Sequence, residues 1–509
     1  RYLAKPPLMK KYVPLMPMVF AILFPLLLNN QRAGLNVLLL NTAILSLLWW
    51  GGRLTFRNSL VTLTVAGTIV SSVMCLLNGS VPAVSVYVIS LILLSGLLAA
   101  PYLSVLLNGF LTTFISLFTA PFNYLKNTGS VYGGGAKTRR VGRYLGYIII
   151  PVFVLLIFVS LYSAASPYFK DLTGDFMLYV ERFFNSLFRN ISPQAFAIGV
   201  GGFITGVILL FGKMTGIFDL PGETGVMDLQ RIKKWYKGSM IGLRAEARIA
   251  TLLFVLLNAA LAVMNVLDFW HVWINFRWDG GFLKQFVHEG TWLLILSIVI
   301  SMALVLWYFR GNLNFYRRNK GLKILARVWL AQNIFLAFSV AVRNFWYLHY
   351  FNLAYKRIWV FAFLIMVIAG LITVIIKVEQ RKTLKYLLVR NSVYVYIIFV
   401  IMGMFNWDVI IAKFNVSRAD KAFYHTDFMV TLNESALPYL MMDKQRYQVV
   451  EKAQAGMFTY SKNYLSFADY DTIVMHRKEL FINEFQKRHW LSWNAADWRS
   501  YRKLLHLMP

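Results

Sequence analysis

Residues 358–376 read IWVFAFLIMVIAGLITVII and contain no charged side chain, whereas Lys356, Arg357 and Lys377 flank them. The hydrocarbon core of a bilayer is about 30 Å thick and an α-helix rises about 1.5 Å per residue, so about 20 apolar residues cross it. Trp359 lies at one end of the stretch, where amphipathic rings prefer the membrane interface. The stretch therefore predicts a transmembrane α-helix.

Apolar blocks of similar length recur along the 509-residue chain, which is 58% hydrophobic and only 15% charged and has a mean hydropathy of +0.57. A soluble protein carries about 25% charged residues, and its core could not bury so many long apolar blocks. We therefore predict an all-α, polytopic membrane protein with about 11 transmembrane helices. The blocks besides 358–376 are 12–29, 33–50, 59–77, 81–100, 144–163, 194–211, 249–267, 291–309, 324–342 and 391–411.

The first block follows Lys10 and Lys11 and in this respect resembles a signal peptide. No small-residue cleavage site follows it, so we interpret it as the first membrane helix. Because the sequence starts at Arg1 and not at Met, we expect the natural N-terminus to lie further upstream.

The net charge of +30 is spread over short patches between the apolar blocks. A nucleic-acid-binding protein would gather such charge on one soluble domain, so we predict no nucleic-acid partner. Basic patches that lie between membrane helices instead set topology and contact anionic lipid headgroups, which makes membrane lipids the expected contacts.

The positive-inside rule assigns the strongly basic loops to the cytoplasm, and the loops with balanced charge, 164–193 and 268–290, to the outside. The N-terminus is then cytoplasmic and the C-terminus extracytoplasmic, provided that residues 101–125 do not cross. The loop charges fit one alternating path only if 101–125 does not cross, and polar residues interrupt this segment, so we predict that it is an interfacial amphipathic helix on the cytoplasmic face. The basic loops are 126–143, 213–248, 310–323 and 377–390, and the interrupting residues are Asn108, Thr112, Thr113 and Ser116.

Four regions follow from this path. The N-terminal membrane helices occupy 1–100, the interfacial helix and a basic loop 101–143, the main bundle 144–411, and a small helical extracytoplasmic tail 412–509. The tail has no apolar run long enough to span a membrane. Its stretches 444–461 and 476–491 have helical spacing of apolar and aromatic residues, and its tryptophans disfavour a disordered tail.

Six ionisable residues are expected on the outer face, at helix ends or in loops. Imidazoles and carboxylates at one level can bind a metal, relay protons or hold a polar ligand. The favoured interpretation is that they are ordinary interfacial residues, satisfied by water and by one another. Position 292 is Trp and not His, so His288 and Glu289 do not form a zinc-protease motif. We assign no cofactor and no metal ion. The six residues are Asp268, His271, His288, Glu289, Arg343 and His349.

Four amide side chains, Asn258, Asn265, Gln332 and Asn333, fall inside the predicted helices 249–267 and 324–342. In hydrocarbon each needs a hydrogen-bond partner, so both helices should lie in the interior of the bundle. Interhelical hydrogen bonding is the favoured role, and a polar pathway through the bundle is the alternative.

Three further features indicate no catalytic or metal-binding chemistry. The stretch from Gly133 to Thr138 fails as a phosphate-binding loop because its Lys137 does not follow a glycine and no strand precedes it. The single cysteine, Cys75, excludes an intrachain disulfide or a thiolate metal cluster. Gly202 and Gly206 form a small-xxx-small pair that predicts close helix packing.

Short motifs follow one another from Phe286 to Thr291, from Phe309 to Phe315, over Gln332-Asn333, Arg343-Asn344 and Tyr355 to Ile358, and then over Asn406-Trp407-Asp408, Ile411 and Asn415. Their order resembles the bacterial membrane-protein family catalogued as a domain of unknown function (the 4153/4173 group), especially its members from the Bacteroidetes. The resemblance covers roughly 190–440. It implies a multi-spanning inner-membrane protein and transfers no substrate, cofactor or catalytic residue. Ala354 stands where the family often has Thr, which argues against a catalytic hydroxyl there.

These observations leave three functions open. The favoured one is a non-enzymatic component of the bacterial inner membrane, a scaffold, sensor or assembly partner whose tail contacts envelope proteins. The second is a transporter or ion-coupled membrane component, which predicts a polar path joining Asn258 and Gln332 to both faces. The third is an outer-leaflet lipid- or glycan-modifying enzyme that uses His288, Glu289 and His271.

Overall fold

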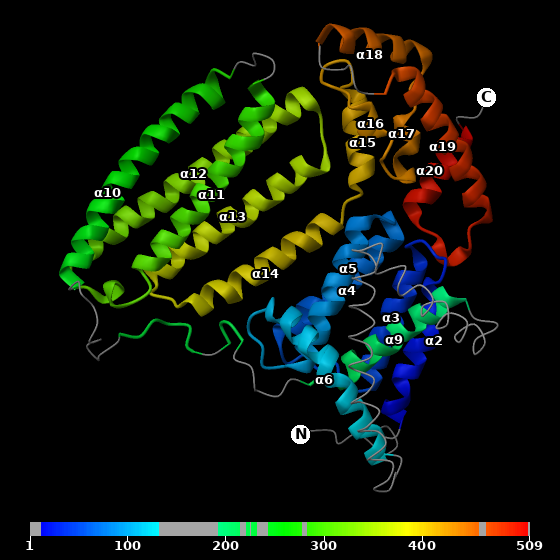
Figure 1. Cartoon of the computed structure of the whole chain (residues 1–509), viewed down its shortest axis with the longest axis horizontal. Coiled ribbons are helices and arrows are strands. Elements are labelled where there is room, and N and C mark those ends of the chain that lie inside the picture. Colours follow the sequence, from blue (N-terminus) through cyan, green and yellow to red (C-terminus); the bar gives the residue numbers. More distant parts are fainter. Residues whose placement is uncertain are drawn as a thin grey trace, which may run out of the picture. The chain divides into compact units, whose positions relative to one another are not determined.

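The computed structural model describes residues 12–131, 192–213, 220–223, 225–231, 243–276, 282–457 and 465–506 (Figure 1). Within these ranges the regular structure is helical, and a single antiparallel bridge between Asp228 and Lys382 is the nearest approach to a sheet. The predicted all-α class is therefore confirmed. The expected span 144–163 and the stretch from Gly133 to Thr138 lie outside the described residues.

The chain divides into two compact units, which are considered separately. The first comprises Arg1–Asp219 together with Arg488–Ala495, and the second comprises Leu220–Lys487 together with Ala496–Pro509. A short stretch of the tail thus belongs to the first unit, while most of the tail belongs to the second.

Among the described residues of the first unit, six longer helices form its framework. Side-chain caps fix where three of them begin: Asn58 accepts a hydrogen bond from the Leu60 amide at the start of α4, Ser80 accepts one from the Ala83 amide at the start of α5, and Ser192 accepts one from the Ala195 amide at the start of α9. The elements are η1 (Val13–Leu15), α2 (Met16–Leu28), α3 (Leu35–Trp50), α4 (Ser59–Asn78), α5 (Val81–Ala99), α6 (Asn108–Val131), α9 (Pro193–Phe211) and η6 (Trp490–Ser492).

Glycines allow close helix packing in this unit. A Cβ atom on Gly202 of α9 would lie 2.6 Å from the Phe20 carbonyl oxygen of α2, and one on Gly206 would lie 3.0 Å from the Phe20 ring. The small-xxx-small pair therefore lets α2 and α9 approach closely, as predicted. Tail residues join the same unit, since the Leu35 amide donates to the Trp493 carbonyl at 2.9 Å.

Helix α6 covers most of the segment predicted to be interfacial. Its polar residues Asn108, Thr112 and Ser116 are buried, while Phe114 is 64% exposed. The polar side chains thus face the protein and the apolar ones face outward, which is the reverse of a helix whose polar face meets water. Among the described residues α6 is not one of the helices long and apolar enough to span. Its depth in the bilayer stays a prediction.

The second unit holds the remaining helices. Buried residues of α10, α11, α12 and α13 share one apolar core, and the tail helices form another around Ile411, Leu437, Tyr470 and Leu504. The elements are α10 (Leu243–Asp268), η2 (Phe269–Ile274), α11 (Phe282–Tyr308), η3 (Asn312–Phe315), α12 (Lys320–Phe351), α13 (Tyr355–Glu379), α14 (Leu384–Gly403), α15 (Trp407–Ser417), α16 (Thr426–Met429), η4 (Glu434–Ala436), α17 (Leu437–Leu440), α18 (Lys444–Met457), α19 (Phe467–Lys487) and α20 (Ala495–His506).

Eight helices among the described residues are long and apolar enough to cross a membrane, and Val13–Leu28 and Leu35–Trp50 are shorter apolar helices. Each predicted block inside the described ranges overlaps one of these ten segments. The last block, expected at 391–411, is wrong in its bounds. Helix α14 ends at Gly403, because Asn406 accepts a hydrogen bond from the Val409 amide and caps a new helix, α15.

Candidate functional site

The predicted polar residues of α10 and α12 lie along the contact between these two helices. Asn258 and Asn265 are seven residues apart on α10, so two turns of helix bring them to one face, and Asp268 follows three residues later. On α12, Gln332 and Ser339 are seven residues apart and Arg343 follows four residues later, so these three side chains also share one helix face. The helices pack against each other. A polar stripe therefore runs along an otherwise apolar interface.

The first tier of this stripe consists of amides. Gln332 Nε2 donates to Asn258 Oδ1 at 2.8 Å, and Asn258 Nδ2 donates to the Leu325 carbonyl at 3.1 Å. Asn265 Nδ2 donates to the Gln332 carbonyl at 3.2 Å. These bonds join α10 to α12, the favoured role for such residues in hydrocarbon. Asn333 instead bonds within α12, to the Trp329 carbonyl at 2.8 Å.

Asp268 and Arg343 form the second tier, a buried ion pair. Each side chain is only 4% exposed. The Arg343 guanidinium donates to Asp268 Oδ1, and Ser339 Oγ donates to Oδ2 of the same carboxylate at 2.7 Å. The opposite charge and the hydroxyl therefore offset the high free-energy cost of burying an isolated charge inside the helix bundle.

A π-helix, η2, begins immediately after Asp268. Its six residues widen the helix and change the direction of its carbonyl groups. Trp346 Nε1 of α12 donates to the Val272 carbonyl at 2.8 Å, and Trp273 stacks on Phe335 with ring centroids 5.4 Å apart. Aromatic side chains from α12 therefore hold the irregular segment in place. π-Helical turns of this kind are frequent at functional sites.

The other described members of the predicted outer-face group, His271 and His349, do not contact this ion pair. His271 lies exposed on the π-helix, and His349 lies exposed near the end of α12, where the Arg418 guanidinium contacts its ring nitrogen at 3.3 Å. The side chains of His288 and Glu289, in the first turns of α11, lie outside the described residues. Of the described side chains in the predicted group, Asp268 and Arg343 are the pair brought together.

A second polar assembly, which sequence reasoning did not identify as a site, joins the turn between α12 and α13 to the tail. Asn415 of α15 exchanges two hydrogen bonds with the Leu353 backbone, at 2.8 and 2.9 Å. Tyr355 donates to Asp408 Oδ1 at 2.5 Å, and the same oxygen accepts from the Asn433 amide at 3.0 Å. We call this assembly the α12–tail junction; it comprises these residues together with Asn352 and the loop 417–423.

Asn352 shows how tightly the junction is built. Its backbone has a positive φ of +61°, which is uncommon for a non-glycine residue. Its side-chain amide is buried and donates to the Phe423 carbonyl at 3.1 Å. The Arg357 guanidinium donates to the Phe351 carbonyl at 2.7 Å and to the Asn352 carbonyl. The end of α12 is thereby fixed from the tail side and from α13.

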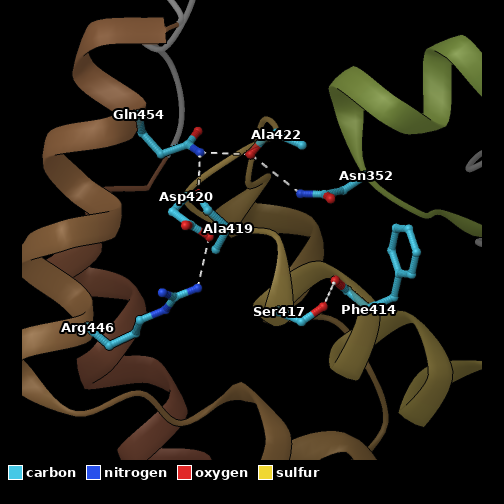
Figure 2. A network of polar contacts seen from close by, with 8 residues as sticks. All are labelled: Asn352, Phe414, Ser417, Ala419, Asp420, Ala422, Arg446 and Gln454. Carbon is cyan, nitrogen blue, oxygen red and sulfur yellow. Dashed lines mark hydrogen bonds and ion pairs between the residues drawn. The ribbon is translucent and has the colours of Figure 1, made fainter.

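Figure 2 shows the loop 417–423, which receives hydrogen bonds from α18 and from Asn352 at the end of α12. Gln454 of α18 donates to the Ala419 and Ala422 carbonyls at 2.7 and 2.8 Å, and Arg446 of α18 pairs with Asp420 at 2.9 Å. Asn352, which directly follows α12, donates to the Ala422 carbonyl at 3.5 Å. One loop thus connects a membrane helix with a tail helix.

The sequence contains one signal of this junction, namely the short motifs of the family resemblance. Tyr355, Arg357, Asp408 and Asn415 all belong to the short motifs on which the family resemblance rests. No spacing rule relates them, because they come from segments more than fifty residues apart. Their pairing becomes visible only when the tail is folded.

The apolar helices and the polar residues buried between them define a polytopic, all-α membrane protein. The sequence pattern of the family described as a domain of unknown function (DUF4153) matches residues 34–442, and the chain belongs to this family. The match reaches further towards the N-terminus than the resemblance at 190–440 indicated. No curated protein and no solved structure matches the chain.

Proposed function

We propose that this protein is a non-enzymatic component of the bacterial inner membrane whose tail engages other envelope proteins, as a scaffold, sensor or assembly partner. The observation that carries the proposal is the α12–tail junction. The tail has an apolar core of its own and is hydrogen-bonded to the end of α12 through buried side chains. A tail built only as a linker would need neither feature.

The junction gives the tail a means of communicating with the membrane helices. A partner that binds the tail can shift the conformation of α12 only if the two move together. Asn352 and Gln454 meet on one loop, and α12 also carries Gln332 and Arg343 of the polar stripe. A contiguous chain of packed and hydrogen-bonded groups therefore links α18 to the interior of the bundle.

The orientation belongs to the same proposal. Under the positive-inside rule the basic loops support a cytoplasmic N-terminus and an extracytoplasmic tail, on the side where envelope proteins are available. The tail also exposes apolar side chains, which are candidates for contact: Val449 on α18 is 54% exposed and Leu480 on α19 is 47% exposed.

Photo-crosslinking in intact cells tests the proposal. A crosslinking amino acid placed at position 449 or 480 should give adducts of discrete, protein-sized mass. The control position is Trp307 on the apolar helix α11, which is 62% exposed and should give lipid adducts only. If positions 449 and 480 give no protein adduct while position 307 labels lipid normally, the proposed role of the tail is wrong.

The buried ion pair favours a second function, an ion-coupled membrane component. A carboxylate, a guanidinium and a hydroxyl inside a helix bundle are groups that can take part in proton or ion movement. In proteoliposomes with a pH-sensitive dye inside, this function requires a proton flux that Asp268→Asn abolishes. An equal dye response in the wild type, the variant and empty vesicles would exclude proton movement.

A further inference from the structure

Two lysines converge on one phenol at the surface of the tail. Lys503 Nζ of α20 donates to the Tyr439 hydroxyl of α17 at 2.7 Å. The ammonium groups of Lys503 and of Lys413 on α15 lie 4.4 and 4.6 Å from the centre of the Tyr439 ring. Both lysine side chains are exposed. Three tail elements thus present two positive charges around a single oxygen.

The arrangement concentrates positive charge. Burial acts to raise the pKa of Tyr439, but the hydrogen bond from Lys503 and the charges of Lys413 and Lys503 outweigh it, so the pKa lies below its ordinary value. Among the described residues, the acid of α15 is Asp408 and the acid of α20 is Asp497, and both are buried. Neither carboxylate lies on the exposed surface where it could neutralise the lysines.

We propose that Lys413, Tyr439 and Lys503 form a binding site for a phosphate-bearing anion. Two ammonium groups that repel each other gain free energy when a shared anion lies between them. Each ammonium has three donors, and the phenol can donate as well, so the three groups suit the several oxygens of a phosphate group. The exposed Arg499 and Arg502 of α20 extend the positive surface beside the site.

Two sources can supply that phosphate: a lipid headgroup or a free phosphate compound. The headgroup source fits the chain path. Helix α15 starts at Trp407, shortly after the apolar helix α14 ends at Gly403, and Lys413 lies six residues further, about 9 Å along the helix axis. Trp498, over which the Arg502 guanidinium lies at 5.9 Å, is an aromatic residue of the kind that prefers the membrane interface.

The test compares the double variant Lys413→Gln/Lys503→Gln with Lys444→Gln/Lys452→Gln, which removes the same charge from two exposed lysines of α18. Binding of phosphatidylglycerol to the full-length protein in detergent is measured by native mass spectrometry. Stabilisation by inorganic phosphate is measured on lipid-depleted protein against chloride at equal ionic strength. A charge-preserving variant, Lys413→Arg/Lys503→Arg, checks that a loss reflects charge and not folding.

Each lysine near an anionic group contributes about a five-fold gain in affinity, so the glutamine variant at the site should bind about 25-fold more weakly. Loss of phosphatidylglycerol binding identifies the headgroup source. Loss of phosphate stabilisation with lipid binding unchanged identifies the free-phosphate source. In both cases the arginine variant should retain binding. If the two glutamine variants behave alike in both measurements, the site does not exist.

Discussion

At the scale of single residues, burial of charge is what distinguishes this chain from a simple bundle of apolar helices. Asp268 and Arg343 are almost fully buried and are separated by 75 positions in the sequence. Each is tolerated only because the other is present, and Ser339 satisfies the second carboxylate oxygen. Such a pair costs stability relative to apolar residues, which suggests that it is retained for specificity or function.

Replacing Asp268 by Asn should therefore destabilise the protein strongly. It leaves the Arg343 charge buried without its counter-charge, at a cost of about 3–5 kcal/mol. The double variant Asp268→Leu/Arg343→Met removes both charges and should recover most of the loss. The free energy of unfolding in mixed micelles measures both effects. Equal stability of the wild type and the single variant would show that the pair is not buried as described.

At the scale of elements, short helices in the tail depend on single caps. The four-residue helix α16 begins after His425, whose Nδ1 accepts a hydrogen bond from the Phe428 amide at 3.2 Å. Burial lowers the pKa of His425; the charge of Asp427 acts in the opposite direction and that of Arg357 in the same direction. The neutral imidazole is therefore the form that the folded tail requires.

The stability of this part of the tail should fall in acid. A lowered pKa in the folded state means that the contribution is complete above the unfolded pKa of about 6.5 and is lost as pH falls towards the folded value. Hydrogen exchange of α16, corrected for the intrinsic effect of pH, should show more frequent opening at pH 5.5 than at pH 7.5. His425→Asn keeps an acceptor at the cap without titrating, so its opening should not depend on pH. A pH dependence that persists in this variant would assign the effect to another group.

Close packing of α5 and α6 depends on glycine. A Cβ atom on Gly96 would lie 2.0 Å from the Gly109 carbonyl oxygen, which is backbone and cannot move aside cheaply. Gly96→Ala should cost about 1–3 kcal/mol by forcing the helices apart. Gly201→Ala is the matched control, because nothing lies within 4 Å of its added Cβ. Thermal unfolding measures the difference, and equal melting temperatures would contradict the packing.

Some features of the helices can be predicted from the sequence and others cannot. Apolar blocks locate membrane helices because length and hydropathy alone decide whether a segment can span. They do not locate the break after Gly403, which the cap at Asn406 produces, or the π-helix after Asp268, which packing against Trp346 stabilises. The sequence identifies the polar residues of α6. Whether these residues face water or protein depends on a neighbouring helix that the sequence does not reveal.

At the scale of the whole molecule, the tail is the part least evident from the sequence. Its helices were predicted, but Arg488–Ala495 belongs to the first unit and the rest to the second. The pairing of Asp268 with Arg343 and of Tyr355 with Asp408 likewise depends on long-range folding. Sequence patterns indicated which residues are unusual, and the fold assigns their partners.

The orientation of the molecule is a prediction that a reporter can check. Alkaline phosphatase fused after Pro509 should be active, because it folds only on the extracytoplasmic side, and a fluorescent protein that needs the cytoplasm should be dark. This orientation is expected because the loops assigned to the cytoplasmic side carry an excess of Lys and Arg. The opposite pattern would rule out an odd number of crossings from a cytoplasmic N-terminus.

The most direct test of the proposed role is purification of the native protein in a gentle detergent, followed by quantitative mass spectrometry of everything that remains bound. We expect one or more envelope proteins at constant stoichiometry. Val449→Glu, at an exposed apolar position of α18, should release them, whereas Gln445→Glu, one turn away, adds the same charge and should not. A solitary protein that carries only lipid would contradict the scaffold account and favour the ion-coupled alternative.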